Sequence, residues 1–179
     1  MRVIAGKARG HRLHSPRSPA TRPTSDLVRG AIFSSLQSQG VDLSRVLDLY
    51  AGTGALGIEA LSRGAAWCDF VERNGTACAL IRRNLEDTGF SGQSHVYCLT
   101  VERALEELSG PYGLVLADPP YDDASAVPLL EKVIEKALLA EDGVVVLEQG
   151  SRQASPESLG PLTLQRSQRH GDTQVLIYR

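Results

Sequence analysis

Residues 46–57 read Val46-Leu47-Asp48-Leu49-Tyr50-Ala51-Gly52-Thr53-Gly54-Ala55-Leu56-Gly57, and this stretch decides the fold. The apolar run at 46–50 is typical of a buried strand, and the apolar spacing that follows is typical of a helix reaching about Arg63. Glycines between the two allow a sharp turn and a close approach of the backbone to a ligand, beside a helix N-terminus. The stretch therefore predicts a strand, a glycine loop and a helix, as in the first unit of a doubly wound α/β sheet.

The sequence beyond this unit continues to alternate between strand-like and helix-like segments. Apolar runs predict strands at 67–71, 96–99, 114–117 and 144–147, and helical spacing predicts helices at 75–88, 101–108 and 127–139. The C-terminal end predicts an antiparallel hairpin, 162–165 and 174–178. Such alternation predicts a mostly parallel sheet with helices on both faces.

The N-terminal residues follow a different pattern. Two short strands are expected at 3–6 and 11–14, joined by a glycine turn and followed by a loop rich in proline and serine. Thr24 or Ser25 can then cap a helix that continues to about Ser38. We therefore expect a short N-terminal β-hairpin plus helix as an extension of the main sheet.

Length and composition indicate a globular protein. The chain has 179 residues, of which 42% are hydrophobic and 22% are charged, an ordinary balance for this class. This length fits a single domain over 1–179, with a basic extension at 1–40 and a Rossmann-like core at 41–179. No apolar run approaches the ~20 residues of a membrane span, and no secretion signal is recognisable. We therefore expect a cytoplasmic protein that contacts no membrane.

The cysteines give no sign of a metal site. Cys68, Cys78 and Cys98 are odd in number and form no CxxC pair, so neither a metal nor a disulfide is expected. All three lie among apolar residues, which predicts buried thiols.

Charge is distributed unevenly along the chain, although the net charge is only −2. Residues 1–30 hold seven Lys or Arg against one acid, whereas the remainder holds twelve against twenty. A basic arm on an acidic body is expected where one patch meets phosphate, and a solvated basic tail is the alternative. Lys7, Arg9 and Arg12 of the expected hairpin are the candidate phosphate contacts. Arg29, expected on the helix face opposite the apolar stripe, is either a fourth contact or a surface arginine.

The glycine pattern Gly52-Thr53-Gly54-Ala55-Leu56-Gly57 would also fit a dinucleotide site or a tight turn that binds nothing. Two acids favour an adenosyl cofactor instead. Asp48, at the end of the first strand, suits a ligand that carries an amino group and a sulfonium, and it would repel a pyrophosphate. Glu72 ends the second strand, where a carboxylate can accept both ribose hydroxyls, although a surface acid would look the same. Together these residues predict S-adenosylmethionine as the cofactor.

A catalytic tetrapeptide, Asp118-Pro119-Pro120-Tyr121, follows the fourth strand. If the first and fourth strands are neighbours, this loop faces the glycine loop across the crevice where ligands of open α/β sheets bind. The Asp118 carboxylate and the Pro119 carbonyl can accept hydrogen bonds from an exocyclic amine of a nucleobase, which leaves the lone pair of its nitrogen available for attack. The prolines stiffen the loop, and Tyr121 offers a flat face for an unstacked base. A proline turn with a packing tyrosine is the alternative interpretation. The methylation needs neither a metal nor a covalent intermediate.

With these residues in place, the chain resembles the RsmD family of bacterial ribosomal RNA methyltransferases over nearly its whole length. Asp-Pro-Pro-Tyr alone also fits DNA adenine and protein glutamine methyltransferases, but four motifs in order are specific. They are Arg2–Gly6 with Gly10 and Leu13, then Arg22–Arg29 with Ile32 and Phe33, then Leu47–Gly57 with Glu59–Ala65, and lastly 118–121.

The resemblance implies a class I methyltransferase with a Rossmann-like, seven-stranded sheet. It also implies methylation of a guanine exocyclic amine in 16S RNA, within an assembled or partly assembled 30S subunit. Asp48, Gly52, Gly54 and Glu72 would hold the cofactor, while Arg22, Pro23 and Thr24 would cover its methionine end. Asp118 and Tyr121 would hold the guanine. Tyr50 and Ala51, beside the glycine loop, are further candidate cofactor contacts.

One position departs from the family pattern. Many such enzymes place Asp or Asn after the third strand to bind the adenine amine, and here the nearest match is Thr100, a weaker acceptor. Two other functions stay open: the same chemistry on DNA adenine or protein glutamine, and a non-enzymatic assembly factor that binds RNA. A monomer is the simplest expectation.

Overall fold

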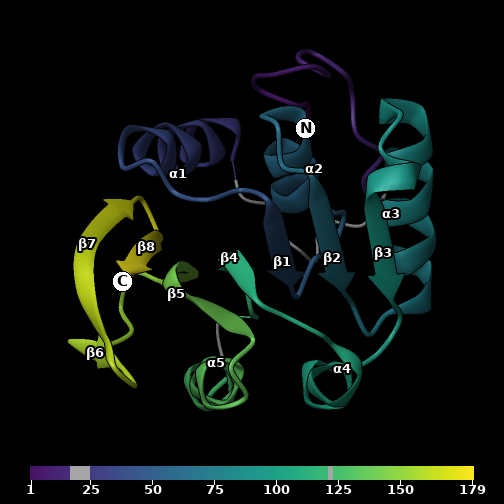
Figure 1. Cartoon of the computed structure of the whole chain (residues 1–179). Helices are drawn as coiled ribbons and strands as arrows, with labels where there is room; N and C mark the ends of the chain where they lie inside the picture. Colours follow the sequence, from purple (N-terminus) through teal and green to yellow (C-terminus); the bar gives the residue numbers. More distant parts are fainter. Residues whose placement is uncertain (17–24, 121–122) are drawn as a thin grey trace.

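A single twisted sheet forms the centre of the computed structural model, which describes residues 1–16, 25–120 and 123–179. Its eight strands lie in the order β3-β2-β1-β4-β5-β8-β7-β6 (Figure 1). The first five strands are parallel, and β8 is inserted antiparallel between β5 and β7. The strands are β1 Arg45–Leu49, β2 Trp67–Val71, β3 Ser94–Tyr97, β4 Tyr112–Ala117, β5 Leu139–Gly150, β6 Ser158–Leu159, β7 Leu162–His170 and β8 Thr173–Tyr178.

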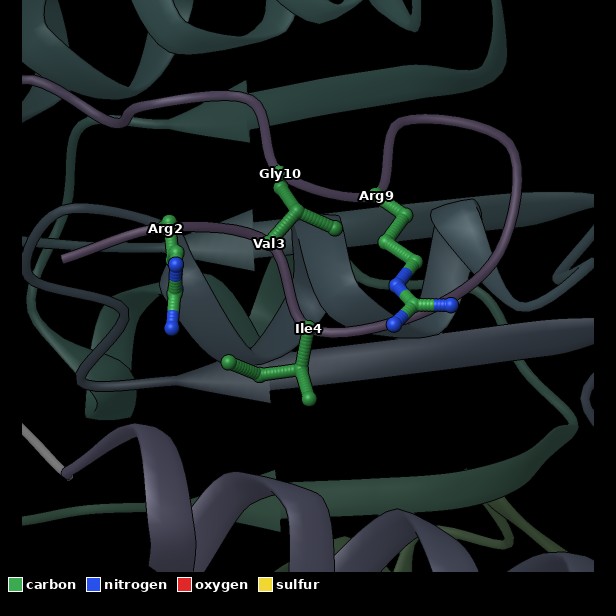
Figure 2. Close-up of a pocket in the computed structure, with 5 residues that line it drawn as sticks. All are labelled: Arg2, Val3, Ile4, Arg9 and Gly10. Atoms are coloured by element: carbon green, nitrogen blue, oxygen red, sulfur yellow. The ribbon is translucent and has the colours of Figure 1, made fainter.

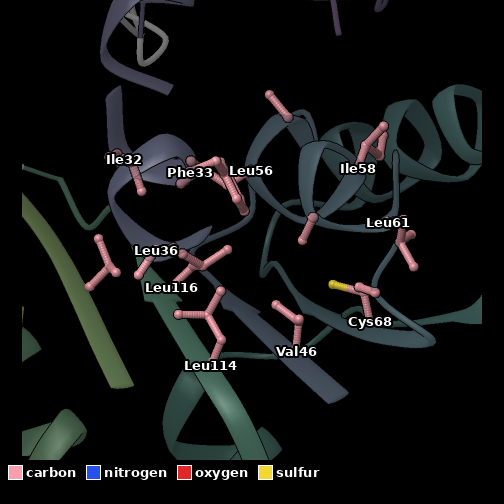
Figure 3. Packing of buried hydrophobic residues seen from close by; sticks show 14 of the residues in the cluster. Ile32, Phe33, Leu36, Val46, Leu56, Ile58, Leu61, Cys68, Leu114 and Leu116 are labelled. Carbon is pink, nitrogen blue, oxygen red and sulfur yellow. The ribbon is translucent and has the colours of Figure 1, made fainter. Parts of the chain in front are cut away.

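Helices cover both faces of this sheet (Figure 1). One cluster of buried side chains joins a sheet face to α1, α2 and α3, and a second joins the opposite face to α4 and α5. Neighbouring residues of one strand enter different clusters, as Val46 and Leu47 do, because side chains alternate across a strand. Figure 3 shows the first cluster, where Phe33 and Leu36 of α1 meet Leu114 and Leu116 of β4. The helices are α1 Asp26–Ser38, α2 Ala55–Ser62, α3 Gly75–Thr88, α4 Val101–Glu107 and α5 Ala126–Glu135.

The Rossmann-like class I architecture predicted from the sequence is confirmed, and the number of strands is corrected. Seven strands were expected, and the eighth is β6, a two-residue strand that pairs with the start of β7. Two residues are too short for any periodic pattern to reveal.

The expected N-terminal hairpin is also smaller than predicted. Its two strands reduce to one isolated antiparallel bridge between Arg2 and Arg12. Backbone hydrogen bonds such as that from the N–H of Val3 to the carbonyl of His11 still join the two segments, but the N–H groups of Ile4 and Ala5 donate to Glu59 of α2 instead of extending the ladder. The segment is therefore shaped by the helices beneath it.

The cysteines only partly follow the expectation of burial. Cys68 and Cys78 are buried, whereas Cys98 is exposed because it lies just beyond the end of β3, at the edge of the sheet. In the part of the chain that the structure describes, no three His, Cys, Asp or Glu side chains group as metal ligands would. None of the helices described has the length and apolarity needed to cross a membrane.

Candidate active site

The candidate site lies beyond the carboxyl ends of β1, β2 and β4. β1 pairs on one side with β2, where Leu49 lies opposite Val71, and on the other with β4, where Leu49 lies opposite Ala117. The next residues along these strands are Glu72 and Asp118, which therefore flank the start of the glycine loop from either side. The chain leaves β1 toward β2 on one side while β4 lies on the other, so this is the switch point of the sheet.

The glycine loop requires glycine for two different reasons. Gly52 and Gly54 have φ angles of 56° and 78°, in the left-handed region that side chains disfavour. Gly57 is helical, and a Cβ there would overlap the ring of Phe70 and come within 2.7 Å of the Sγ of Cys68. The first two glycines shape the turn, and the third lets α2 pack closely against β2.

Tyr50 enters the loop in a conformation that is rare for its type. Its φ of 58° lies in the left-handed region, and such strained residues gather at functional sites. Burial, together with the negative charge of Asp123, raises the pKa of the Tyr50 phenol to about 12, so the hydroxyl stays protonated at neutral pH. Ala51 follows, and its N–H donates to the Val71 carbonyl at 3.0 Å, which holds the loop against the end of β2.

Asp48 is a buried acid beneath the loop, with a side chain only 1% exposed. Its Oδ2 accepts a hydrogen bond from the N–H of Gly57 at 2.8 Å. Its Oδ1 has no hydrogen-bond partner among the residues that the structure describes. Burial raises the pKa of Asp48 well above its usual value, and the negative charges of Asp118 and Glu72 raise it further. Three acids that converge in this way favour a cationic ligand.

Glu72 ties the end of β2 to the glycine loop. Its two carboxylate oxygens accept hydrogen bonds from the N–H of Gly52 at 2.9 Å and of Asn74 at 2.8 Å. A carboxylate offers about four acceptor sites, so these bonds leave room for two hydroxyl donors. The side chain is half-buried and can therefore reach a ligand above the loop.

Thr100 lies beyond β3 and caps α4. Its Oγ1 accepts a hydrogen bond from the N–H of Arg103 at 3.5 Å, which is long for a bond of this kind. The hydroxyl is half-buried at the same edge of the sheet as Glu72. Thr100 is therefore placed beside the site with part of its acceptor capacity already used.

The candidate catalytic loop begins directly after β4. Asp118 is half-buried, Pro119 is buried, and the carbonyl of Pro120 accepts a hydrogen bond from the N–H of Asp123 at 2.9 Å. That hydrogen bond links the two described residues on either side of 121–122. Tyr121 lies outside the described residues, as do Arg22, Pro23 and Thr24, so their expected roles stay predictions.

The four candidate RNA contacts divide into two groups. Lys7, Arg9 and Arg12 are exposed on the N-terminal segment, as expected. Figure 2 shows Arg9 at one side of a surface hollow of about 250 Å³, with Arg2 at its other side. Arg29 differs from the expectation, because its side chain is fully buried.

The burial of Arg29 has a structural cause. Its guanidinium donates to the carbonyl of Arg2 at 2.6 Å and to Asp26 at 2.8 Å. The N-terminal segment thus covers the polar face of α1 at Arg29. Helical spacing alone could not predict this cover. We therefore assign Arg29 to the anchoring of that segment, and not to contact with phosphate.

Sequence reasoning missed the side chains that hold the N-terminal segment in place. Glu59 is fully buried and pairs with Arg63 at 2.7 Å, besides accepting from the backbone of Ile4 and Ala5. Asn84 is also fully buried and bonds to both the N–H and the carbonyl of His14. The one available signal was an acid inside the apolar run of 55–61, because a buried acid needs partners.

Comparisons with known proteins agree along the whole chain. The family model described as conserved hypothetical protein 95 matches residues 1–179. The protein YlbH of Bacillus subtilis is 39% identical over 100% of this chain and 98% of its own. "Ribosomal RNA small subunit methyltransferase D" of Escherichia coli K12 is 30% identical over 100% of this chain and 89% of its own length. The solved structure of yhhF from Escherichia coli superposes with a TM-score of 0.87, at 28% identity over 99% of this chain and 96% of that one.

Proposed function

The chain belongs to the RsmD family of methyltransferases, and from this premise we propose that it methylates the exocyclic N2 of a guanine in small-subunit ribosomal RNA with S-adenosylmethionine. One observation carries the proposal. Asp48, Glu72 and Asp118 converge at the switch point of the sheet, and the buried Oδ1 of Asp48 has no partner among the described residues. An ammonium and a sulfonium are the ligand charges that such a set of acids attracts.

The residues around the glycine loop fit this cofactor. Asp48 would attract its positive charges, and Glu72 would accept the ribose hydroxyls. Gly52 and Gly54, without side chains, allow the backbone to approach the ligand closely. Ala51 and Tyr50 would complete the wall, and Thr100 would face the adenine. When bound, S-adenosylmethionine supplies an activated methyl group on a positively charged sulfur.

The catalytic loop is suited to orienting an amine. An exocyclic amine of guanine is a poor nucleophile because its lone pair is delocalised into the ring. The Asp118 carboxylate and the Pro119 carbonyl accept hydrogen bonds from its two N–H groups. These bonds favour a pyramidal nitrogen whose lone pair faces the glycine loop. Alignment of this kind lowers the entropic barrier of attack, and the rigid loop keeps that alignment. The methylated amine then releases its extra proton to water, and Tyr121 stacks on the base.

The RNA would be held by the basic N-terminal segment. Lys7, Arg9 and Arg12 are exposed and can contact phosphates, whereas the rest of the chain is acidic. A substrate within a 30S particle would present phosphates on either side of the target base. We further propose that residues 1–179 act as one unit and as a monomer.

Transfer of labelled methyl groups tests the function. We would incubate the protein and labelled S-adenosylmethionine with unmodified 30S subunits, naked small-subunit rRNA and duplex DNA in parallel. Digestion to nucleosides would identify the product. We expect label in N2-methylguanosine from rRNA, and the better of the two RNA substrates shows whether the particle is needed. Label in methyladenine of DNA, or none in RNA despite cofactor binding, would refute the RNA substrate.

A further inference from the structure

Asn84 connects two parts of the molecule that the proposed function uses separately. It lies on α3, its side chain is fully buried, and it belongs to neither the glycine loop nor the N-terminal segment. Its Oδ1 accepts a hydrogen bond from the N–H of His14 at 2.7 Å. Its Nδ2 donates to the carbonyl of His14 at 3.1 Å and to the carbonyl of Thr53 at 2.9 Å. One amide group thus joins the N-terminal segment to the glycine loop.

Both ends of this connection lie close to groups that bind a ligand in the proposed function. Thr53 stands between Gly52 and Gly54, and Gly54 donates in turn to the carbonyl of Ala51 at 2.7 Å. A peptide group is planar, so fixing the Thr53 carbonyl also orients the N–H of Gly54. His14 follows the candidate phosphate contact Arg12 by two residues, with the buried Leu13 between them.

The two segments also touch directly. The hydroxyl of Thr53 lies 3.9 Å from the sulfur of Met1, and the carbonyl of Met1 accepts from the N–H of Leu13 at 3.2 Å. A shift of the glycine loop would therefore move acceptor groups that belong to the N-terminal segment. The amide of Asn84 is inaccessible to water, so a partner lost on one side has no substitute.

We propose that Asn84 is a positioning residue that couples the occupancy of the glycine loop to the placement of the basic N-terminal segment. Each of the two ligands then binds more tightly when the other is present, because coupling between two sites is reciprocal. The inference rests on the proposed function, since it assigns the cofactor to the loop and the RNA to the segment. A consequence of this coupling is that the protein without its cofactor binds RNA more weakly and releases it.

Two measurements test the coupling. The first is the affinity for S-adenosylhomocysteine, the demethylated cofactor, with and without naked small-subunit rRNA. We expect rRNA to tighten this affinity about five-fold or more in the wild type. In Asn84→Ala the ratio of the affinities with and without rRNA should approach one, whatever the change in the affinity measured without RNA. The second is hydrogen exchange of the amides of residues 1–14, which S-adenosylhomocysteine should slow in the wild type without any RNA.

Matched variants separate coupling from loss of stability. Leu85→Ala truncates the adjacent buried residue of α3 and leaves all three amide bonds intact. It should keep both the affinity ratio and the slowed exchange. Asp87→Asn weakens the exposed contact of Asp87 with the His14 ring, 2.8 Å in length, and should behave in the same way.

The outcomes also distinguish this inference from the function beneath it. A wild type that binds no S-adenosylhomocysteine would refute the cofactor assignment and the coupling together. The coupling alone would be overturned if the wild type binds both ligands but its S-adenosylhomocysteine affinity is the same with and without rRNA. It would also be overturned if S-adenosylhomocysteine does not change hydrogen exchange at residues 1–14. The same holds if a folded Asn84→Ala keeps the wild-type ratio. The exchange measurement on the wild type decides the matter even if that variant does not fold.

Discussion

The charge of Asp48 has two opposite effects. In the proposed function it attracts the cationic cofactor, whereas in the free protein the same buried charge is destabilising. Burial and the neighbouring acids raise its pKa well above the usual value. The folded state therefore holds a proton at Asp48 more tightly than the unfolded state does. Stability falls as the pH rises from the unfolded pKa through the folded pKa, and above the folded pKa the penalty is complete.

Asparagine at position 48 carries no charge and removes this penalty. Asp48→Asn should raise the stability of the free protein by about 1 kcal/mol at neutral pH, which corresponds to about 2–4 °C in Tm. The gain should disappear below the unfolded pKa of aspartate, where both proteins are uncharged at this position. The same variant should bind S-adenosylmethionine at least ten-fold more weakly, about 1.4 kcal/mol. Thermal unfolding across pH and calorimetric titration measure the two effects, with the exposed Glu106→Gln as the control. A variant that is less stable at neutral pH would contradict the argument.

Asp118 should separate chemistry from cofactor binding. We expect Asp118→Ala to lower single-turnover methyl transfer at least about 100-fold, since removal of one oriented catalytic partner typically costs that much. Its affinity for S-adenosylmethionine should fall far less than its turnover, because Asp48 and Glu72 remain. Asp118→Asn retains one acceptor oxygen and should lose less. Turnover at the wild-type level in Asp118→Ala would show that this loop does not orient the amine.

At the scale of elements, the approach of α2 to β2 depends on the missing side chain of Gly57. Gly57→Ala should destabilise the protein by about 1–3 kcal/mol, the usual cost of overpacking, since the new methyl group meets Phe70 and Cys68. Gly75→Ala in the first turn of α3 is the matched control, because a Cβ there meets nothing within 4 Å. That variant should be neutral or slightly more stable. Urea denaturation of both would decide, and equal stabilities would contradict the close packing.

The elements that could be predicted are those whose pattern is complete within a short stretch. Residues 67–71 and 75–88 have the predicted bounds, because a short apolar run and helical spacing are local properties. The long β5 was recognised only over 144–147, since its earlier part, Leu139–Gly143, is less apolar and pairs irregularly with β4. The N-terminal strands were predicted too long for the opposite reason: beyond the bridge between Arg2 and Arg12, backbone groups of Ile4 and Ala5 bond to Glu59 and Ser62, which are far away in sequence.

The candidate site shows the same division. Convergence of Glu72 and Asp118 on the glycine loop followed from strand order, and the observed register brings them there. The roles of Arg29 and Asn84 could not be foreseen, because each is set by the segment that covers it. A polar residue on a helix looks exposed until the tertiary structure buries it. The sequence therefore predicts which acids meet, and misses which polar groups hold the molecule together.

At the scale of the whole molecule, opposite charges are separated along the chain. The exposed positive charges of Lys7, Arg9 and Arg12 belong to a segment fastened to α2 and α3, on an otherwise acidic protein. A polyanion is therefore attracted to one part of the surface and repelled by the remainder. In the proposed function, such separation would orient the RNA as well as bind it, since approach of the RNA from other directions is unfavourable.

Charge reversal of this segment tests that arrangement. Lys7→Glu, Arg9→Glu and Arg12→Glu together should weaken rRNA binding. They should also reduce the slope of log affinity against log salt by about 2, since each lost phosphate contact removes about 0.7–0.9. Lys136→Glu, Arg152→Glu and Arg169→Glu change the net charge equally at exposed positions outside the segment. If net charge alone governed binding, both triple variants would lose the same affinity. We expect the reduced salt slope in the N-terminal variant alone. Both variants should keep the wild-type affinity for S-adenosylmethionine in the absence of RNA. Equal slopes in the two variants would mean that the RNA is bound elsewhere on the protein. The separated charge would then only guide the RNA as it approaches the surface.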